Sequence, residues 1–321
     1  MKLKLTLLNK NYIILAHKNP LQLTKLIEKL NDENCFFYIH LDKNTEAIPF
    51  KKALKHKKNV YFTTIREEGT WCDIGIVKGT LNSLQQIIND KREGYCILIS
   101  GQDYPIKSNK QIDAFLDKNF GIDFIESFEI PNTIWFEKGL NRINFHKFNL
   151  SKKRGHFITC PTPFDKQFYK FQTIKNNIKL IINCKFYYLY KQLTVRKHPN
   201  YIRPYGGSQW WALSMETVKK INLFVLENPD FLKYHQYSLL PDEMFFQTIV
   251  NHLKSENNIK IQDTLTFVDW NRKNAVSAPT LDNNDFELLI NQPENKLFAR
   301  KFDFEYDFDI IKKLDGFLEK N

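Results

Sequence analysis

Short apolar runs alternate with segments of helical pattern through the first 130 residues of this 321-residue chain. The runs typical of strands lie at 12–16, 36–40, 60–63, 95–99 and 124–126. Between them, 21–30, 74–88 and 109–119 carry apolar side chains at helical spacing. Repeated strand–helix units predict an α/β fold, with a central, mostly parallel sheet flanked by helices. The length suits one large domain, so we expect a single domain over 1–321 that opens with a ligand-binding half at 1–130.

Polar residues follow several of these predicted strands. Ligands in sheets of this kind bind beyond the carboxyl ends of the strands. This rule selects His17, residues 40–42 with Asp42 at their end, Glu126 and the turn at 100–103, in which Asp103 supplies a carboxylate. Gly101 in the same turn allows a ligand to approach the backbone closely, although the turn is equally typical of a simple helix cap.

The positive charge of the chain is concentrated in residues 138–203. This block holds fifteen Lys and Arg against one acid, Asp165, and carries +14, whereas the formal charge of the whole chain is +11 and the other 255 residues therefore sum to −3. We interpret the block as a basic helical insertion that meets a polyanion or an anionic membrane face; the alternative is an ordinary solvated surface. Its most apolar part, 178–193, is interrupted by polar residues and predicts an amphipathic or interfacial helix, and no run in the chain reaches the length of a membrane span.

The alternation resumes in residues 204–321, the predicted acceptor-binding and catalytic half. Strands are expected at 208–213 and 265–270, and helices at 215–226, 241–252 and 307–320. The run Gly206-Gly-Ser-Gln-Trp-Trp211 suits the binding of a sugar ring, or equally a glycine turn that leads into a strand with a buried Trp. Glu243 lies in the first turn of the helix that Pro241 opens, where it either caps the helix or serves as a general base.

Several common sites find no support in the sequence. The five cysteines are widely spaced and form no CxxC pair, which argues against a disulfide framework or a zinc site and favours a reducing, cytoplasmic location. Dinucleotide-binding and P-loop glycine motifs are absent. The pair Asp307 and Asp309 falls in a predicted C-terminal helix, so we expect a solvated acidic turn there and no bound metal.

Seven motifs occur in the order typical of one known family. They are Ile14-Leu-Ala-His17, Ile39-His-Leu-Asp42, Ser100-Gly-Gln-Asp-Tyr-Pro-Ile-Lys107, Gly207-Ser-Gln-Trp-Trp211, Pro241-Asp-Glu243, Phe267-Val-Asp-Trp270 and Leu297-Phe-Ala-Arg-Lys-Phe302. The ordered set resembles the Core-2/I-branching β-1,6-N-acetylglucosaminyltransferases (glycosyltransferase family 14), in particular their compact bacterial members.

The resemblance implies a GT-A-type fold and an inverting, metal-independent transfer from a UDP-sugar, with Glu243 as the general base. N-acetylglucosamine is the first expectation for the sugar, and UDP-xylose or another UDP-sugar is the alternative. Lys301 would face the diphosphate, with Arg300 beside it and a second cation supplied by Arg272 or Lys273. Donor-side positions are His17, Asp42, Gly101 and Asp103, and acceptor-side positions are Glu126, Arg142, Ser208, Gln209, Trp210 and Trp270.

The acceptor implied is a glycan or a lipid-linked oligosaccharide of bacterial surface polysaccharide synthesis. The basic block is expected to face this acceptor, or the inner face of the cytoplasmic membrane, and to leave UDP binding unaffected. The rival hypothesis from another class is a polyanion-binding protein that uses the block on nucleic acid; it lacks a recognised nucleic-acid motif. A catalytically inactive scaffold is a third option, against which Glu243, Asp103 and Lys301 argue.

Overall fold

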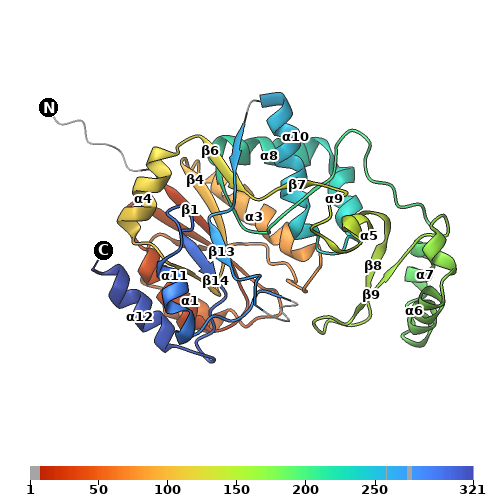
Figure 1. Ribbon diagram of the computed structural model, residues 1–321, viewed down its shortest axis with the longest axis horizontal. Coiled ribbons are helices and arrows are strands. Elements are labelled where there is room, and N and C mark those ends of the chain that lie inside the picture. The colour runs from red at the N-terminus through yellow and green to blue at the C-terminus, as the bar shows by residue number, and fades with distance from the viewer. Residues whose placement is uncertain (1–7, 258, 273–276, 321) are drawn as a thin grey trace.

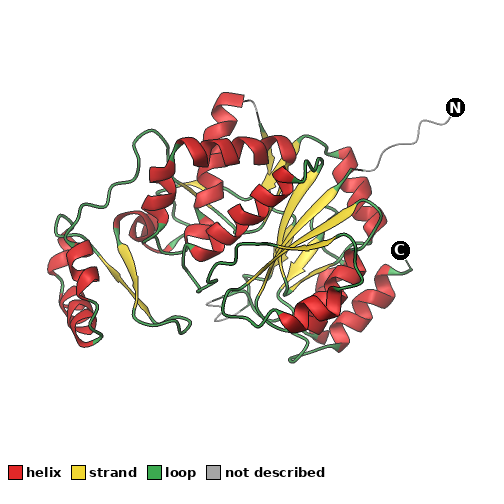
Figure 2. Cartoon of the chain, turned by 180° about the vertical axis from the view of Figure 1, so that it is seen from behind, coloured by secondary structure: helices red, strands yellow, loops and turns green. Residues whose placement is uncertain are grey.

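The computed structural model describes residues 8–257, 259–272 and 277–320. Its centre is a seven-stranded sheet (Figures 1 and 2) made of β1 (Lys10–Ala16), β2 (Cys35–Leu41), β3 (Val60–Phe62), β4 (Tyr95–Ser100), β6 (Ile122–Ile125), β11 (Trp211–Ser214) and β12 (Lys260–Gln262). The strand order is β12-β6-β11-β4-β1-β2-β3. Only β11 runs antiparallel to its neighbours, so the sheet is mostly parallel as predicted.

Helices cover both faces of this sheet, as the alternation predicted. One face packs against α1 (Pro20–Leu30), α2 (Ile48–Leu54), α4 (Asn109–Lys118) and α12 (Asp309–Leu318). The other packs against α3 (Gly75–Asn89), α8 (Met215–Glu227), α9 (Pro229–His235) and α10 (Phe245–Asn257). Strand β1 shows why the strand runs are continuously apolar, because Tyr12 and Ile14 enter the first core while Ile13 enters the second.

A second sheet of three strands, absent from the sequence-based prediction, joins distant parts of the chain. It consists of β5 (Asp103–Pro105), β13 (Thr266–Val268) and β14 (Phe298–Arg300), in the order β13-β14-β5. Strands β14 and β5 are antiparallel, and their register places Arg300 opposite Asp103. Because β13 and β14 are parallel, the residues that follow them, including Trp270 and Lys301, leave the sheet at the same end.

The basic block forms a lobe at one side of the molecule (Figure 1). It contains α5 (Leu140–Asn144), a hairpin of β8 (His146–Asn149) and β9 (Phe157–Cys160), and the helices α6 (Phe171–Ile182) and α7 (Phe186–Gln192). Phe148, Ile158 and Leu180 belong to a small core of its own. The single helix expected over 178–193 is wrong, since the chain turns at Cys184 (φ 54°) where the backbone N–H of Lys185 bonds the carbonyl of Leu180 and ends α6.

Short elements complete the chain. They are the pair β7 (Phe128–Glu129) and β10 (Tyr205–Gly206), the helix α11 (Phe286–Ile290) and the 3₁₀ turns η1 (Phe136–Gly139), η2 (Lys166–Tyr169), η3 (Pro241–Glu243) and η4 (Asn283–Asp285). Within the described ranges, no helix is both long and apolar enough to cross a membrane.

Candidate active site

Residues selected by the strand-end rule do lie at one edge of the central sheet. His17 follows β1, Asp42 follows β2, the turn at 100–103 follows β4 and Glu126 follows β6. Strands β1, β2 and β4 pair in parallel, and β6 shares their direction because both β6 and β4 pair antiparallel to β11. The sequence therefore placed these four positions correctly.

Asp42 shapes a loop beside this edge. Its carboxylate accepts hydrogen bonds from the backbone N–H of Asn44 (2.8 Å) and of Gly69. The N–H of Lys43 bonds the carbonyl of Glu67 at 3.0 Å, which ties the loop of residues 66–71 to the end of β2. His17 is exposed next to this arrangement, and its carbonyl accepts from Thr45 Oγ1 at 2.9 Å.

Asp103 is buried and forms an ion pair with Arg300. Its carboxylate is buried, accepts from Ser100 N and Ser100 Oγ at 2.8 Å each, and lies 3.1 Å from Arg300 Nε. Burial raises the pKa of Asp103, although the charge of Arg300 opposes the shift. The expectation that Asp103 meets the donor sugar is therefore corrected: it positions Arg300. Gly101 is also buried, and its nearest neighbour is Ala16 of β1.

Arg300 stacks on Trp210, a residue expected to hold the acceptor sugar. The guanidinium carbon lies 3.9 Å from the Trp210 ring centroid, and Trp210 is 4% exposed. Because Trp210 is buried and Arg300 covers one face of its ring, the ring is not open to a sugar, which corrects this expectation. Trp270 is 64% exposed after β13 and is open to a ligand.

The turn before Trp210 is built against Glu126. The N–H of Ser208 donates to Glu126 Oε2 at 2.8 Å, and burial raises the pKa of Glu126. Gly207 lies so close that a Cβ there would come within 1.9 Å of the Glu126 carbonyl oxygen, which explains the need for glycine. Gln209 is half-buried in the same turn. Glu126, Ser208 and Gln209 therefore gather in one place.

Glu243 ends the 3₁₀ turn η3, and Met244 separates this turn from α10. The helix predicted over 241–252 is thus two elements, because Met244 (φ −131°, ψ −34°) leaves the helical conformation between them. Glu243 Oε2 accepts a hydrogen bond from Arg142 Nη1, and the Arg142 guanidinium stacks 3.6 Å above the Trp135 ring. The Glu243 side chain is 30% exposed, so it is fixed in orientation yet reachable from solvent.

Asp242 is buried beside Glu243. Burial and the charge of Glu243 raise the pKa of Asp242 to about 7. Arg300 is close enough that the charges of both Asp242 and Glu243 favour its protonated form. Arg300 therefore couples the Glu243 turn electrostatically to the end of β14.

We expect Asp242→Asn to change how stability depends on pH. In the native state Asp242 keeps its proton up to about pH 7, whereas the unfolded chain loses it near pH 4, so native stability falls as the pH rises between these values. Asparagine cannot titrate, and the variant should gain stability relative to the parent chain across this window, by at most about 4 kcal/mol. Urea unfolding at pH 5, 6.5 and 8 measures this, and a constant difference between the two proteins would contradict it.

A group of cations lies around Lys301. Lys301 is half-buried directly after β14, and Lys18 pairs with Asp303 nearby. Arg154, at the tip of the β8–β9 hairpin, lies with its guanidinium carbon 5.0 Å from the Trp71 ring centroid. Burial lowers the pKa of Lys301, and the largest charge effect in the same direction comes from Arg154.

The hairpin tip is anchored to the loop that Asp42 shapes. Lys152 forms an ion pair with Glu68 at 2.7 Å, and Trp71 contacts Phe157 of β9. Burial lowers the pKa of His17, and the charges of Lys18 and Arg154 act in the same direction. The tip of the basic block, which was expected to face the acceptor and to leave UDP binding unaffected, thus lies near Lys301 as well. The sequence signalled the charge of this hairpin but not where it folds.

Arg272 does not join this group. Its guanidinium pairs with Asp285 and with Asp269 (3.3 Å), and it donates to the Thr280 carbonyl at 3.1 Å. Two carboxylates already neutralise it, which corrects its expected role as the second cation. Lys273, the other expected cation, lies outside the described residues.

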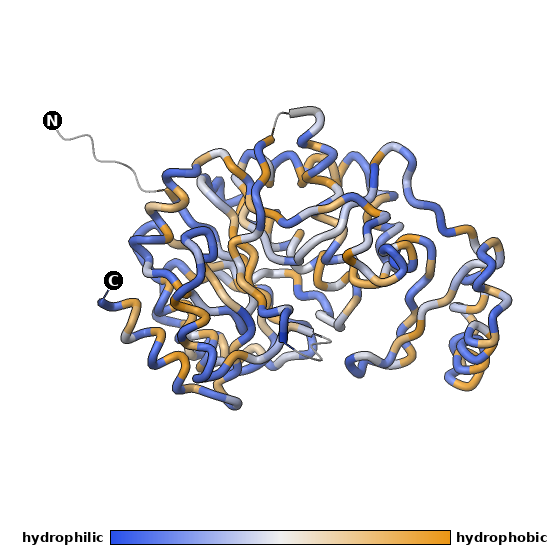
Figure 3. The backbone as a smooth tube through the Cα atoms, viewed as in Figure 1, coloured by the Kyte–Doolittle hydropathy of each residue, from blue (hydrophilic) through white to orange (hydrophobic). Residues whose placement is uncertain are grey.

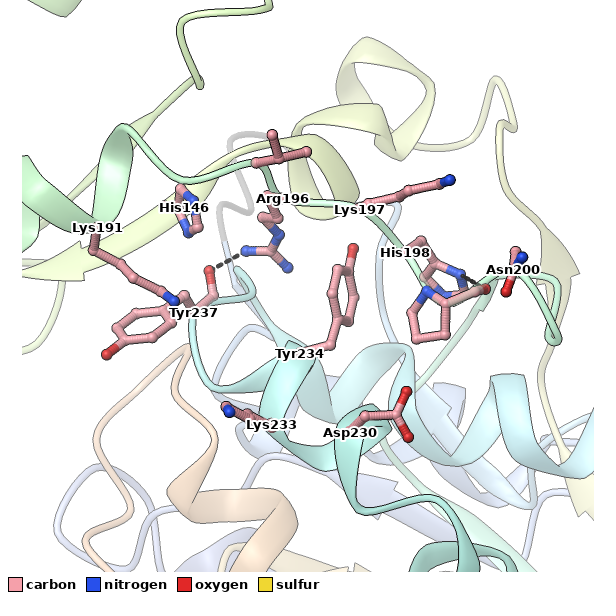
Figure 4. A pocket seen from close by; sticks show the side chains of 12 residues that line it. His146, Lys191, Arg196, Lys197, His198, Asn200, Asp230, Lys233, Tyr234 and Tyr237 are labelled. Atoms are coloured by element: carbon pink, nitrogen blue, oxygen red, sulfur yellow. Dashed lines mark hydrogen bonds between the residues drawn. The ribbon is translucent and has the colours of Figure 1, made fainter.

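A pocket of about 370 Å³ lies between α9 and the part of the basic block at 191–200 (Figure 4). Arg196 crosses it and donates to the carbonyls of Ile143 (2.8 Å) and Phe145 (2.7 Å), with a longer bond to the carbonyl of Arg142 (3.3 Å). Burial lowers the pKa of His146 in this pocket to about 4, so the ring is neutral at pH 7. Arg196 thus holds the helix that presents Arg142 to Glu243, a positioning role that the sequence did not reveal.

Comparison with known proteins identifies relatives along most of the chain. The family model described as Core-2/I-Branching enzyme matches residues 11–287, a range that ends before Arg300 and Lys301. Xylosyltransferase 2 of Rattus norvegicus is 25% identical over 326 residues, which cover 95% of this chain and 33% of the relative. Xylosyltransferase 1 of Homo sapiens is 23% identical over 330 residues, covering 97% and 30%. The chain thus spans about a third of the length of these relatives.

Proposed function

The chain belongs to the Core-2/I-branching enzyme family, and we propose that it is a glycosyltransferase that moves a sugar from a UDP-sugar to a hydroxyl group of a glycan acceptor. One observation carries the proposal: Glu243, held by Arg142 and open to solvent, is coupled through Arg300 to the cations around Lys301. A general base and a group of cations that can bind an anion are the two components that such a transfer requires.

In the proposed reaction Glu243 takes the proton of the acceptor hydroxyl. The acceptor oxygen bonds to the anomeric carbon, the bond from that carbon to the phosphate oxygen breaks, and its electron pair leaves with UDP. A single displacement of this kind inverts the anomeric configuration, and it requires the base and the leaving group on opposite sides of the sugar. Trp270 and Glu126, with Ser208 and Gln209, would then line the acceptor side.

The donor diphosphate is assigned to Lys301, with Arg154 as the second cation. Arg154 is exposed, has no acidic partner among the described residues and lies close enough to Lys301 for its charge to lower the pKa of Lys301. An anion between two like charges relieves that repulsion. These cations would take over the charge stabilisation that a metal often supplies, and we propose that transfer requires no metal.

For the donor sugar, the names of the relatives favour xylose, whereas the motif resemblance favours N-acetylglucosamine. A UDP-release assay over a panel of UDP-sugars, run with and without EDTA, tests both choices. Release from one donor that EDTA leaves unchanged is expected. A requirement for manganese would overturn the metal-independent proposal, and no release or binding with any UDP-sugar would overturn the function itself.

We expect Arg154→Met to weaken UDP binding about fivefold and to leave uridine binding unchanged, because uridine has no phosphate. Lys153→Met is the matched control. It removes the same charge at the neighbouring position, and the Lys153 side chain has no partner among the described residues. Titration calorimetry with both ligands gives the dissociation constants. Equal weakening by the two variants would show that only the general charge of the hairpin matters.

A further inference from the structure

Helix α6 carries its apolar side chains on the outside of the molecule. At least about half of each of these side chains is exposed: Phe171, Ile174, Ile178, Ile181 and Ile182. Their spacing of three and four residues places them on one face of the helix. A helix of a globular protein normally turns such a face toward the core.

The inward face of α6 is largely polar. Thr173 and Asn176 are buried there, together with Leu180. The amide of Asn176 donates to the Thr159 carbonyl of β9 at 3.1 Å, and Thr173 Oγ1 donates to the Gln167 carbonyl at 2.8 Å. These hydrogen bonds fix the orientation of α6, so its apolar face points away from the rest of the lobe.

Helix α7 extends the same surface. Phe186, Tyr187 and Tyr190 are 60 to 67% exposed, and Leu193 beyond the helix is 60% exposed. The two helices lie together at the outer end of the lobe, away from the central sheet (Figures 1 and 2). The outer end of the lobe carries both hydrophobic and hydrophilic positions (Figure 3). We call the exposed apolar side chains of α6 and α7 the apolar patch, and exposed apolar groups of this kind mark an interaction surface.

The segment that carries this patch is rich in lysine. Lys175 Nζ lies 4.6 Å from the Phe171 ring centroid, Lys166, Lys170 and Lys179 are also exposed, and residues 166–203 contain no Asp or Glu. A second copy of the lobe would bring two uniformly positive surfaces together, which disfavours self-association through this face. Nucleic acid would match the charge but would leave the isoleucines without apolar contacts.

We infer that α6 and α7 lie in the headgroup region of an anionic lipid bilayer, with the isoleucine and aromatic side chains inserted and the lysines against lipid phosphates. Outward apolar side chains with flanking lysines are typical of interfacial helices, and long lysine side chains reach the phosphate level from such a position. This inference is independent of the proposed function, since it concerns a surface remote from Glu243.

Flotation with vesicles of stated composition tests the inference on the full chain. Binding to vesicles that contain phosphatidylcholine and phosphatidylglycerol, with little binding to phosphatidylcholine alone, is expected, as is weakening in 0.5 M NaCl. The double variant Ile178→Ser and Ile182→Ser should lower the partition coefficient at least tenfold. The control Leu21→Ser and Leu226→Ser changes two residues on the body of the molecule that are 69% and 68% exposed, against 49% and 72% for Ile178 and Ile182, and should have no effect.

Three outcomes would overturn the inference. One is the absence of binding by the parent chain to anionic vesicles. Another is equal loss of binding in the test and control variants. The third is self-association in analytical ultracentrifugation that the Ile178 and Ile182 changes abolish while vesicle binding persists, which would assign the patch to a second copy.

Discussion

Glu243→Gln is expected to lower the rate of sugar transfer about a thousandfold and to leave UDP binding intact. The amide keeps the size of the side chain and can still accept a bond from Arg142, but it cannot take the proton of the acceptor hydroxyl. General base catalysis contributes on the order of 10²- to 10⁴-fold to reactions of this kind. Single-turnover kinetics with the donor found in the panel, together with the dissociation constant of UDP, measures both quantities.

The matched control is Glu129→Gln. Glu129 is an exposed glutamate that pairs with an arginine, Arg203, at 3.6 Å, as Glu243 pairs with Arg142. Its replacement should leave transfer unchanged. Transfer by the Glu243 variant at the parental rate would refute the assignment of the base, whereas loss of UDP binding would show that the change disturbed the site as a whole.

Lys301→Met is expected to lower kcat/KM for the UDP-sugar by about 10- to 100-fold. The half-buried ammonium would make charged hydrogen bonds to the diphosphate, and each such bond contributes about 1.5–3 kcal/mol. Methionine retains most of the side-chain volume. Steady-state kinetics should show the loss, and Lys301→Arg should recover part of it.

Lys312→Met serves as the control for this change, because Lys312 is exposed and contacts only its near neighbours Asp309 and Phe308 among the described residues. It should behave like the parent chain. If Lys301→Met kept the parental kcat/KM, or if it weakened uridine as strongly as UDP, the diphosphate would not be bound at Lys301.

The central sheet and the residues at its edge could be predicted from patterns in short segments of the sequence. Apolar runs and helical spacing are properties of short segments, and the position of His17, Asp42 and Glu126 follows from where their strands end. The predicted edge is correct because the parallel strands of the sheet all run in the same direction. The partners of the side chains at that edge could not be predicted in this way.

Contacts between residues that are far apart in the chain could not be predicted from the sequence. Asp103 and Arg300 meet only because β5 and β14, almost 200 residues apart, pair in one small sheet. Trp210 is of a residue type that often stacks on sugars, but the pairing of β14 in the same sheet places Arg300 against its ring. Arg154 reaches Trp71 through a hairpin whose destination no local pattern encodes.

The break between α6 and α7 illustrates a further limit. Apolar spacing continues from 178 to 193, yet the turn at Cys184 separates the segment into two helices. Periodicity predicts that a face exists, but it does not say whether the face points to a core or to the outside. The polar contacts of Asn176 decide that for α6.

The anomeric configuration of the first sugar released tests the central claim most directly, and it needs no knowledge of the acceptor. Proton NMR can follow slow hydrolysis of an α-linked UDP-sugar, with water in place of the acceptor hydroxyl. The account predicts that the parent enzyme forms the β-sugar first and that Glu243→Gln forms it far more slowly. Initial release of the α-sugar would contradict a single displacement with Glu243 as the base.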